Sequence, residues 1–576
     1  MTRNYKEEYQ RWLDSPALSE AEWEELNSIA NDEKEIESRF FAPLEFGTAG
    51  LRGTMKLGLH QMNVHIIRHA TQAFANVIKA EGEQAMKKGI AICFDCRNNS
   101  ELFAHEAACV MAANGIHVRI FDALRPTPEL SFAVRYYGTT AGLNITASHN
   151  PKEYNGYKVY WSDGAQLPPQ HAEAIAEQMS NIDIFDDFVS CDFDEAVAQG
   201  KIEFIGTETD EAYLECVLGQ AINKAIVAKV APDFKIVYTP FHGAGYKLVP
   251  EALHRLGITQ LYPVPEQMVI DGNFPTVESP NPENPEGFYL AVDLAKKVGS
   301  DLIIGTDPDS DRIGVMVRSG EDYISITGNQ LGVLLLDYVI NARKAAGTLP
   351  ENAGAVKSIV TTEMAKAVAE TNGVHFEDTF TGFKFMAERI AQWEKAGSYK
   401  YIFAYEESYG YMMGDYVRDK DAVTASMMVA EMAAYYYDKG MNLSQAMESL
   451  YAKYGRYAEK TLNLVMPGLD GIVKMKNLMA ELRSNPPKQI AGVEVFKLRD
   501  YSDGSIKVPE LGVMGQTPIK GSNVLYFELA DGTSFIVRPS GTEPKVKVYI
   551  LCKGADKAEC DAKIAKYSEY AEGLRK

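Results

Sequence analysis

The chain of 576 residues is poor in cysteine, with only seven cysteines along its length. So few cysteines in so long a chain do not form the disulfide framework of a small secreted domain. Cys93 and Cys96 form a Cys-x-x-Cys pair, but the pair overlaps an apolar run, IAICFD, that is typical of a buried strand. A zinc site would need a second pair, and the sequence has none. We therefore expect both cysteines to be core residues.

Basic residues are also in deficit, because 58 Lys and Arg face 79 Asp and Glu, giving a formal net charge of −21. This balance excludes a nucleic-acid binder that relies on a broad basic surface. It leaves an anionic small molecule open as a partner, because a local cluster of Arg and Lys can oppose the global sign.

Long apolar segments are missing as well. The opening stretch, MTRNYKEEYQRWLDS, lacks the apolar region of a signal peptide. The longest apolar run, 422–437, is interrupted by Glu431 and is too short to cross a bilayer. We therefore expect a cytoplasmic protein that binds no membrane. Monomer and dimer both remain open.

What the sequence does contain is a regular alternation of helical and strand patterns, which is typical of βαβ units and largely parallel sheets. The alternation begins near residue 60, after a charged helical extension, and restarts near residue 235 and again near residue 329. A different pattern follows from about residue 455, with a helix and then strands joined by Ala-Asp-Gly, a hairpin signal. We therefore expect an α/β fold of three related mixed α/β domains plus a C-terminal α+β domain. The predicted domains are 1–205, 206–322, 323–450 and 451–576.

One polar loop follows an apolar strand in each predicted domain. Ligand sites in open α/β sheets form outside the carboxyl ends of the strands. The four loops are ASHNP (147–151), TDPDSDR (306–312), EESYG (406–410) and RPSGTEPK (538–545). Their recurrence is more informative than any one of them, and it predicts a single site assembled from several domains.

The second loop carries Asp307, Asp309 and Asp311 at alternate positions. Three such carboxylates repel one another unless a cation lies among them. Oxygen ligands suit Mg²⁺, Mn²⁺ or Ca²⁺ rather than Zn²⁺. An EF-hand is excluded, because Arg312 stands where that loop requires glycine. A competing hypothesis makes Asp307 the nucleophile of an aspartyl-phosphate enzyme with Asp309 as the acid, but it leaves Ser148 without a role.

The third and fourth loops suit the two ends of a sugar phosphate. Adjacent carboxylates and a hydroxyl at 406–408 can bond neighbouring sugar hydroxyls, although an exposed acidic turn has the same composition. Arg538 offers a planar fork for a phosphate, and the hydroxyls and backbone N–H groups around Gly541 can form an anion-binding nest. A hairpin turn with a surface arginine is the alternative for that loop.

Ser148 in the first loop is followed by His149, but this serine is not in a Gly-x-Ser-x-Gly elbow. A metal loop, an anion loop and a polyol loop together favour phosphoryl transfer, which needs positioning and charge neutralisation above all. Ser148 would then carry a phosphoryl group beside the cation. Lys158 could move a proton there, because burial among cations would lower the pKa of a lysine.

The motifs ITASHNP, GTDPDSDR, EESYG and RPSGTEPK, in this order, resemble those of the α-D-phosphohexomutases, and in particular the phosphoglucomutase branch. The opening EFGTAGLRG at 45–53 resembles the N-terminal signature of the same family. The resemblance extends from about residue 45 to residue 550. It implies four domains around a central active-site cleft.

The resemblance also implies the reaction, a reversible interconversion of α-D-glucose 1-phosphate and glucose 6-phosphate. A phosphoserine at Ser148 and a glucose 1,6-bisphosphate, which is both intermediate and activator, carry the phosphoryl group. Mg²⁺ is the implied metal, held by the phosphoserine and the three aspartates. The other implied site residues are His149, Lys158 as general base, Arg52 and Arg312 at the phosphotransfer site, Thr381, Gly382, Lys384, Glu406 and Ser408 at the sugar, and Arg538, Ser540, Gly541 and Thr542 at the non-reacting phosphate.

Two alternatives remain open. The EFGTAGLRG opening and the long N-terminal helical segment resemble a longer branch of the family that also includes phosphopentomutases, so phosphomannomutase or phosphopentomutase activity is the nearer alternative. A metal-dependent phosphatase that uses an aspartyl phosphate is the more distant one.

Overall fold

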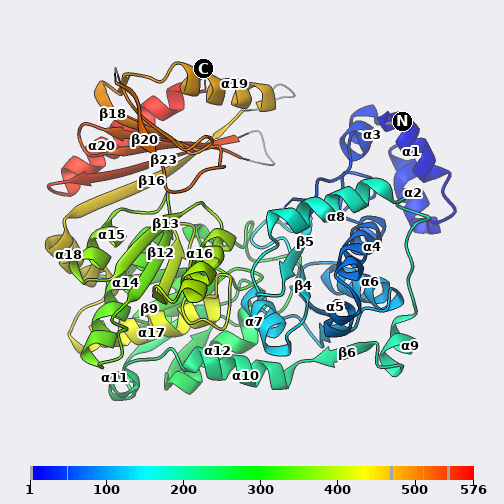
Figure 1. The fold of residues 1–576 in the computed structure, drawn as a ribbon. Coiled ribbons are helices and arrows are strands. Elements are labelled where there is room, and N and C mark those ends of the chain that lie inside the picture. Colours follow the sequence, from blue (N-terminus) through cyan, green and yellow to red (C-terminus); the bar gives the residue numbers. More distant parts are fainter. Residues whose placement is uncertain (1–3, 48–49, 467–470, 510, 541–544, 576) are drawn as a thin grey trace. The chain divides into compact units, whose positions relative to one another are not determined.

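The computed structural model describes residues 4–47, 50–466, 471–509, 511–540 and 545–575 (Figure 1). The chain divides into two compact units. The first unit contains residues 1–327 and 409–442, and the second contains residues 328–408 and 443–576. Residues 409–442, which we assigned to the third domain from the sequence, thus cluster with the first unit. Among the described residues, none of the helices combines the length and apolar character that crossing a bilayer would need.

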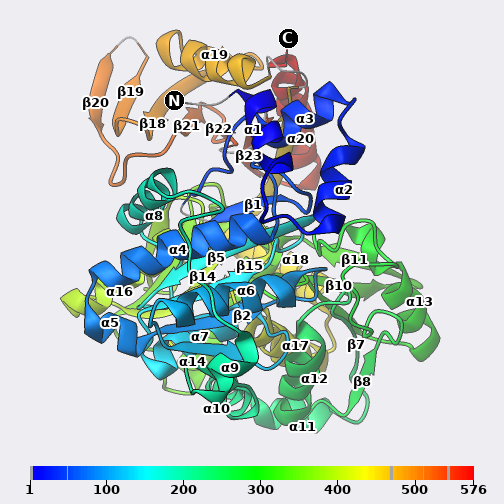
Figure 2. The same cartoon turned by 90° about the vertical axis from the view of Figure 1, so that its right-hand side faces the viewer.

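Three short helices open the first unit, as the charged helical pattern predicts. They are α1 (Tyr5–Leu13), α2 (Glu20–Ser28) and α3 (Glu33–Phe40), and Figure 2 shows them side by side. Asn4, Ser19 and Asp32 cap their first turns through side-chain oxygens. Trp12 is fully buried and meets Phe40 edge-on with ring centroids 5.6 Å apart. The extension therefore shares the hydrophobic core of the first domain.

The first sheet has the strand order β1-β5-β4-β2-β3-β6. Its strands are β1 (Leu51–Thr54), β2 (Ile90–Phe94), β3 (Val118–Phe121), β4 (Ala141–Ile145), β5 (Tyr154–Trp161) and β6 (Ile202–Ile205). β2 is parallel to β3 and β4, and β3 is parallel to β6, whereas β5 and β1 are antiparallel additions. The sheet is therefore mixed, as expected for the α/β domains.

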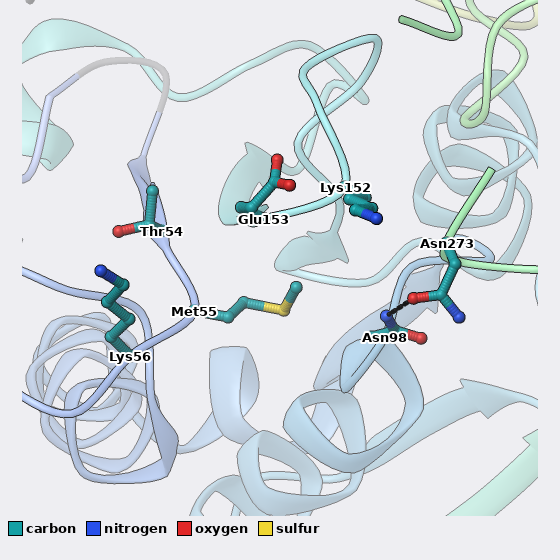
Figure 3. Close-up of a pocket in the computed structure, with 7 residues that line it drawn as sticks. All are labelled: Thr54, Met55, Lys56, Asn98, Lys152, Glu153 and Asn273. Atoms are coloured by element: carbon teal, nitrogen blue, oxygen red, sulfur yellow. Dashed lines mark hydrogen bonds between the residues drawn. The ribbon is translucent and has the colours of Figure 1, made fainter. Parts of the chain in front are cut away.

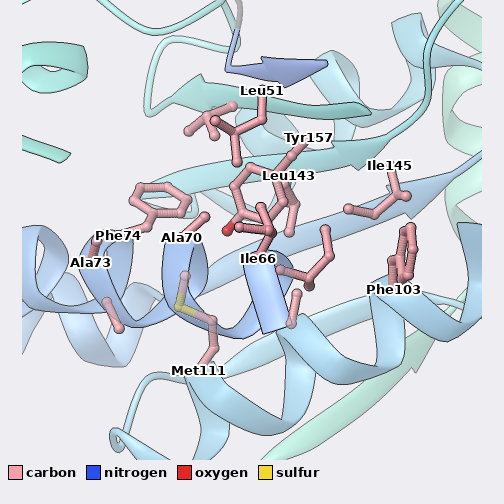
Figure 4. Close-up of a cluster of buried hydrophobic side chains, with 14 of the residues drawn as sticks. Leu51, Ile66, Ala70, Ala73, Phe74, Phe103, Met111, Leu143, Ile145 and Tyr157 are labelled. Carbon is pink, nitrogen blue, oxygen red and sulfur yellow. The ribbon is translucent and has the colours of Figure 1, made fainter. Parts of the chain in front are cut away.

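Alternate residues of β2 face two separate cores, so the strand is apolar throughout. Ile90 and Ile92 join the larger core, where α4 (Val64–Ala80) and α6 (Ser100–Ala113) pack, as Figure 4 shows for Ile66, Ala70 and Met111. Ala91 and Cys93 join a smaller core formed with α7 (Thr127–Tyr137). Cys93 is thus a core cysteine as predicted, whereas Cys96 is only partly buried. The other helices of this first domain are α5 (Glu83–Lys88), α8 (Pro169–Asn181) and α9 (Phe193–Ala198).

The second sheet has the order β11-β10-β9-β7-β8. Its strands are β7 (Lys235–Thr239), β8 (Gln260–Pro263), β9 (Leu302–Thr306), β10 (Ile313–Ser319) and β11 (Asp322–Ile326). β8, β7 and β9 are parallel, and β10 returns antiparallel to β9. The aspartate loop 307–312 is the connection between β9 and β10. The helices of this second domain are α10 (Thr207–Leu218), α11 (Lys224–Val230), α12 (Gly245–Leu256) and α13 (Tyr289–Val298). The later helix α17 (Ala422–Asp438) packs on α11 and α12.

The second unit begins with three parallel strands, in which β12 (Ala353–Ser358) lies between β13 (His375–Thr379) and β14 (Lys400–Glu406). Its helices are α14 (Gly328–Ala345), α15 (Met364–Thr371), α16 (Phe383–Ala396) and α18 (Leu443–Tyr454). The apolar run at 356–361 predicts a strand there, but β12 ends at Ser358. Ile359 and Val360 are apolar for a different reason, because they join a core with Tyr501 and Tyr526 of the C-terminal domain.

The C-terminal domain is an antiparallel sheet in the order β16-β23-β22-β21-β18-β19-β20. Its strands are β16 (Arg456–Val465), β18 (Val493–Asp500), β19 (Ser505–Val508), β20 (Gly512–Gln516), β21 (Leu525–Leu529), β22 (Ser534–Pro539) and β23 (Lys545–Gly554), with β17 (Gln489–Ile490) paired to β18. The helices α19 (Gly471–Ser484) and α20 (Lys557–Gly573) pack against this sheet. The predicted hairpin at Ala-Asp-Gly joins β21 and β22 and is confirmed.

His69 of α4 makes the stability of the first unit dependent on pH. Burial lowers the pKa of His69 below its ordinary value. Its Nε2 lies 3.1 Å from the Ile182 carbonyl oxygen, and its Nδ1 has no hydrogen-bond partner among the described residues. The unfolded chain therefore binds a proton at this site in a pH range where the folded protein does not. Stability falls as the pH drops below about 6.5, the ordinary histidine value.

We expect His69→Gln to weaken this pH dependence, because glutamine can donate to the Ile182 carbonyl without taking up a proton. Urea midpoints measured at about pH 7.5 and about pH 5.5 test this. The difference between the two midpoints should be smaller for the variant than for the unmodified protein. Equal differences would show that the pKa of His69 is the same in the folded and the unfolded protein.

Candidate active site

Ser148 follows β4 and takes a left-handed backbone conformation, with φ of 53°, which is uncommon for a residue other than glycine. Its N–H donates to Thr146 Oγ1 at 2.9 Å. The buried Oγ lies 3.1 Å from His149 Nδ1 and donates to Asp307 Oδ2 at 3.0 Å. Two of the four predicted loops, 159 residues apart, are therefore in direct contact in the first unit.

The three aspartates of the second loop form a buried cluster. One carboxylate oxygen from each of Asp307, Asp309 and Asp311 lies within 4.8 Å of the others. Asp307 Oδ1 accepts the N–H groups of Asp311 and Arg312 at 3.0 and 2.9 Å. Asp309 Oδ1 and Asp311 Oδ1 are buried and accept no hydrogen bond from any described residue. Buried carboxylate oxygens without donors are costly, and a cation with oxygen ligands fits this cluster.

The surroundings of the cluster shift the pKa values of Asp307 and Asp309 in opposite directions. Burial, together with the charges of Asp309 and Asp311, raises the pKa of Asp307 well above its ordinary value. Burial alone would also raise the pKa of Asp309, but the ammonium of Lys158 outweighs it and lowers that pKa. One carboxylate thus resists ionisation while another depends on a neighbouring cation. A divalent ion among these carboxylates would stabilise the ionised form of each of them.

Lys158 extends from β5 into this cluster. Its Nζ lies 2.7 Å from Asp309 Oδ2 and 3.7 Å from Asp311 Oδ2. The structure therefore brings Lys158 to the aspartate loop, as the sequence predicts. The expected environment is wrong, however, because the ion pairs of this lysine are with carboxylates rather than with a group of cations.

Lys420 and Thr127 complete the surroundings of the aspartates, and sequence reasoning missed both. Lys420 Nζ lies 3.1 Å from Asp311 Oδ2, and Thr127 Oγ1 donates to Asp309 Oδ2 at 2.7 Å. A signal for Lys420 exists in the sequence, because the charged run RDKD (418–421) directly precedes the apolar helix α17. All four residues of that run are buried. The rule that sites form in loops after strands does not select this run, because it precedes a helix.

The two predicted arginines flank the same loops. Arg52 Nη1 donates to Asn150 Oδ1 at 3.1 Å, and Arg312 Nη1 lies 2.9 Å from Glu283 Oε1. Burial and the charges of Arg312 and Arg52 hold the pKa of His149 well below its ordinary value. The imidazole is therefore neutral at neutral pH, and its Nδ1 lies next to the serine hydroxyl without adding a charge.

The predicted sugar-binding residues lie in the second unit. Glu406 ends β14, is buried, and accepts a hydrogen bond from the Gly382 N–H, so the loops at 381–384 and 406–408 meet. The Thr381 hydroxyl is buried without a hydrogen-bond partner among the described residues. Lys384 Nζ lies 4.8 Å from the Phe385 ring, and burial lowers its pKa. Ser408 lies in the turn that directly follows Glu406.

Glu407, next to Glu406, is fixed differently. Its Oε2 accepts hydrogen bonds from Ser358 Oγ at 3.0 Å and Thr361 Oγ1 at 3.1 Å. Of the two adjacent carboxylates, Glu407 therefore ties the end of β14 to the turn after β12. Glu406, the residue predicted from the family, instead accepts a hydrogen bond from the loop that carries Gly382.

The predicted phosphate loop follows β22. Arg538 Nη1 donates to the Tyr549 hydroxyl at 3.4 Å, and the Ser540 N–H donates to the Lys545 carbonyl at 2.8 Å. Burial raises the pKa of Tyr549, and the charges of Glu407 and Glu406 add to this while Arg538 opposes it. Glu406 of the predicted sugar site and Arg538 of the predicted phosphate site thus both influence the pKa of the same tyrosine. Gly541 and Thr542 lie outside the described residues.

A cavity of 380 Å³ opens beside the first loop but contains none of the predicted site residues (Figure 3). Residues 54–56 line one side, and Lys152 and Glu153 line another. Asn98 and Asn273 close it with a hydrogen bond of 3.0 Å. Its charged walls are exposed to solvent.

Comparison with known proteins identifies the family. Sequence models of the phosphoglucomutase/phosphomannomutase alpha/beta/alpha domains I, II and III match residues 43–184, 211–320 and 327–454. The model of the C-terminal domain of the same family matches residues 478–566. The chain therefore belongs to the phosphoglucomutase/phosphomannomutase family, the α-D-phosphohexomutases, and has the four-domain α/β architecture of that family.

Curated relatives cover most of the chain. A phosphoglucomutase of Staphylococcus saprophyticus is 35% identical over 520 residues, which are 90% of this chain and 92% of the relative. A phosphoglucomutase of Staphylococcus aureus is 36% identical over 533 residues, 91% of this chain and 92% of the relative.

Solved structures agree on the fold. A putative phosphomannomutase from Thermus thermophilus superposes with a TM-score of 0.68 at 20% identity, covering 92% of this chain and 100% of that one. The Paramecium phosphoprotein pp63/parafusin, described as a phosphoglucomutase, superposes with a TM-score of 0.66 at 18% identity, covering 92% of this chain and 94% of that one.

Proposed function

We propose that the protein is a phosphoglucomutase, which interconverts α-D-glucose 1-phosphate and glucose 6-phosphate. The observation that carries the proposal is the contact of 3.0 Å between Ser148 Oγ and Asp307 Oδ2. It places the hydroxyl of a strained loop at a buried cluster of three aspartates that suits a cation. The relatives that match nine-tenths of the chain carry the name of this activity.

Mg²⁺ is the proposed metal. Asp307, Asp309, Asp311 and a phosphate on Ser148 would hold it, and all of these ligands are oxygens. When bound, the ion would neutralise the charge of the transferring phosphoryl group.

Side chains of the first unit are proposed to perform the transfer. The bond between phosphorus and Ser148 Oγ breaks as a bond forms to the free hydroxyl of the sugar phosphate. Lys158 Nζ, in its neutral amine form, is the group proposed to take the proton of that hydroxyl and, as the ammonium, to return it in the reverse step. Arg52 and Arg312 would pair with the phosphoryl oxygens. His149, being neutral, would orient Ser148 Oγ through Nδ1.

Transfer to the sugar produces glucose 1,6-bisphosphate. The sugar then presents its other phosphate, which returns to Ser148 and leaves the isomeric monophosphate. The enzyme is thus phosphorylated again at the end of each cycle. A lost bisphosphate leaves the enzyme without its phosphoryl group, so added glucose 1,6-bisphosphate would act as an activator.

Residues of the second unit are proposed to recognise the substrate. Glu406 and Ser408 would bond sugar hydroxyls, together with the loop of Thr381, Gly382 and Lys384. Carboxylates and backbone groups tolerate different hydroxyl patterns, which suits a sugar that must bind in two orientations. The non-reacting phosphate would bind the loop of Arg538, Ser540, Gly541 and Thr542.

A panel of substrates tests the assignment. We expect kcat/KM for glucose 1-phosphate, with glucose 1,6-bisphosphate present, to exceed that for mannose, glucosamine and ribose 1-phosphates by about 10-fold or more. A higher value for mannose or ribose 1-phosphate would assign the phosphomannomutase or phosphopentomutase alternative. Release of inorganic phosphate without isomerisation would assign the phosphatase.

A further inference from the structure

We infer that Arg97 is a positioning residue that holds Ser148 in its reactive conformation by donating hydrogen bonds to backbone carbonyls of residues 148–154. The inference rests on the proposed function, because it concerns the loop that would carry the phosphoryl group. Arg97 lies between β2 and α6, far in sequence from the four motifs, and no motif includes it.

The guanidinium of Arg97 is surrounded by carbonyl oxygens of a single loop. Nη1 donates to the carbonyls of Pro151 at 2.9 Å and Tyr154 at 3.1 Å. Nη2 donates to the carbonyls of Ser148 and Asn150. Four backbone groups within seven residues thus converge on one side chain, which is 3% exposed. Such a planar fork fixes the directions of all four carbonyls at once.

Asp95 connects the same arginine to the other side of Ser148. Its Oδ2 lies 3.3 Å from Arg97 Nε and accepts a hydrogen bond of 2.6 Å from Thr146 Oγ1. Thr146 Oγ1 in turn accepts the N–H of Ser148. The N–H of Ser148 is therefore held through Thr146 and Asp95, and its carbonyl is held directly by Arg97. Both peptide groups of a residue with a left-handed φ are fixed by one network.

A loop of the second domain covers the outer face of Arg97. Its guanidinium carbon lies 5.2 Å from the centre of the Phe274 ring, and Phe274 is buried. The neighbouring Asn273 accepts a hydrogen bond from Asn98, as Figure 3 shows. A Cβ on Gly272 would come within 2.4 Å of the Asn98 backbone nitrogen, so the two loops are in close contact. The loop 271–274 thus keeps Arg97 in place from the domain that carries the aspartates.

These contacts connect Arg97 to the rate of transfer rather than to substrate affinity. Arg97 has no contact with Asp307, Asp309 or Asp311 among the contacts that the described residues make. Its removal would release the carbonyl of Ser148 and let Oγ move relative to Asp307. A displacement of about 1 Å in a reacting group costs about 100-fold in rate. A purely structural arginine would instead change the folded fraction and leave the rate per folded molecule intact.

The test compares Arg97→Lys and Arg97→Ala with a matched control, Arg68→Ala. Arg68 lies on α4 of the same domain, and within the described part of the chain its two side-chain hydrogen bonds both go to Glu106. We expect both Arg97 variants to lose about 100-fold in kcat per folded molecule, with KM for glucose 1-phosphate within about threefold of the original value. Lysine should not restore activity, because it keeps the charge but lacks the fork. Added guanidinium ion should partly restore Arg97→Ala, and Arg68→Ala should retain its kcat.

Amide hydrogen exchange tests the same inference without relying on activity. Peptides covering 148–154 should exchange faster in Arg97→Ala than in the unmodified protein and in Arg68→Ala, whereas peptides of β2 and β4 should not. Unchanged exchange in 148–154, or a kcat of Arg97→Lys within about threefold of the original, would overturn the inference. An unmodified protein that fails to isomerise glucose 1-phosphate would refute the proposed function instead, and the exchange result would still decide the role of Arg97.

Discussion

Replacing Ser148 with alanine is expected to lower the rate of glucose 1-phosphate isomerisation by at least about 10⁴-fold. The hydroxyl is the only group that the proposed reaction attaches to phosphorus on the enzyme, so no neighbouring side chain substitutes for it. The contacts that Ser148 makes through its backbone remain available to alanine. The variant should therefore keep the circular dichroism spectrum and melting behaviour of the unmodified protein.

Ser131→Ala is the matched control. Ser131 is a buried serine of α7 in the same domain. Its hydroxyl donates to the Gly164 carbonyl at 2.6 Å and accepts the Arg418 N–H at 2.8 Å. Losing these two hydrogen bonds should reduce stability by about 1–3 kcal/mol and leave kcat per folded molecule within a few-fold. A Ser148→Ala protein that retains more than a tenth of the original rate would exclude Ser148 as the phosphoryl carrier.

Removing divalent ions is expected to have the second largest effect, a loss of at least about 10³-fold in rate that added Mg²⁺ reverses. Without a metal ion, Asp309 Oδ1 and Asp311 Oδ1 are buried without a hydrogen-bond donor among the described residues, and these carboxylates would repel a phosphoryl group. Asp309→Asn should show a comparable loss even with Mg²⁺ present. It should also weaken Mg²⁺ binding measured by calorimetry on the phosphorylated protein.

Asp322→Asn controls for the change of charge, because Asp322 is an exposed acid on β11 of the same domain. That variant should match the unmodified protein in both rate and Mg²⁺ binding. A fully active protein after chelation, with no metal detected by elemental analysis, would contradict the proposed role of the aspartates.

Much of the site in the first unit was predictable because one physical rule applies to the loops that form it. An apolar strand followed by a polar loop places that loop at the carboxyl edge of a sheet, where sites form. Applied to β4 and β9, the rule selects Ser148 and Asp307, which are in hydrogen-bond contact. The repulsion among three alternating aspartates then indicates a cation before any distance is known.

The rest depends on long-range packing that a local pattern does not record. Lys420 reaches the aspartates only because residues 409–442 cluster with the first two domains. Arg97 lies in the loop that follows β2, but it binds backbone carbonyls, so no side-chain motif records its partners. The strands β18, β19 and β20 were missed, and for β20 the reason is that most of its residues are exposed, so they lack a regular apolar alternation.

The position of the phosphoryl group on the enzyme tests the central claim most directly. The protein is incubated with glucose 1,6-bisphosphate and Mg²⁺ and digested, and the phosphate is mapped by mass spectrometry. The account predicts one phosphoryl group on Ser148, which is transferred to the free hydroxyl of a sugar monophosphate such as glucose 6-phosphate when that sugar is added in excess. A phosphoryl group found on Asp307 and never on Ser148 would contradict it.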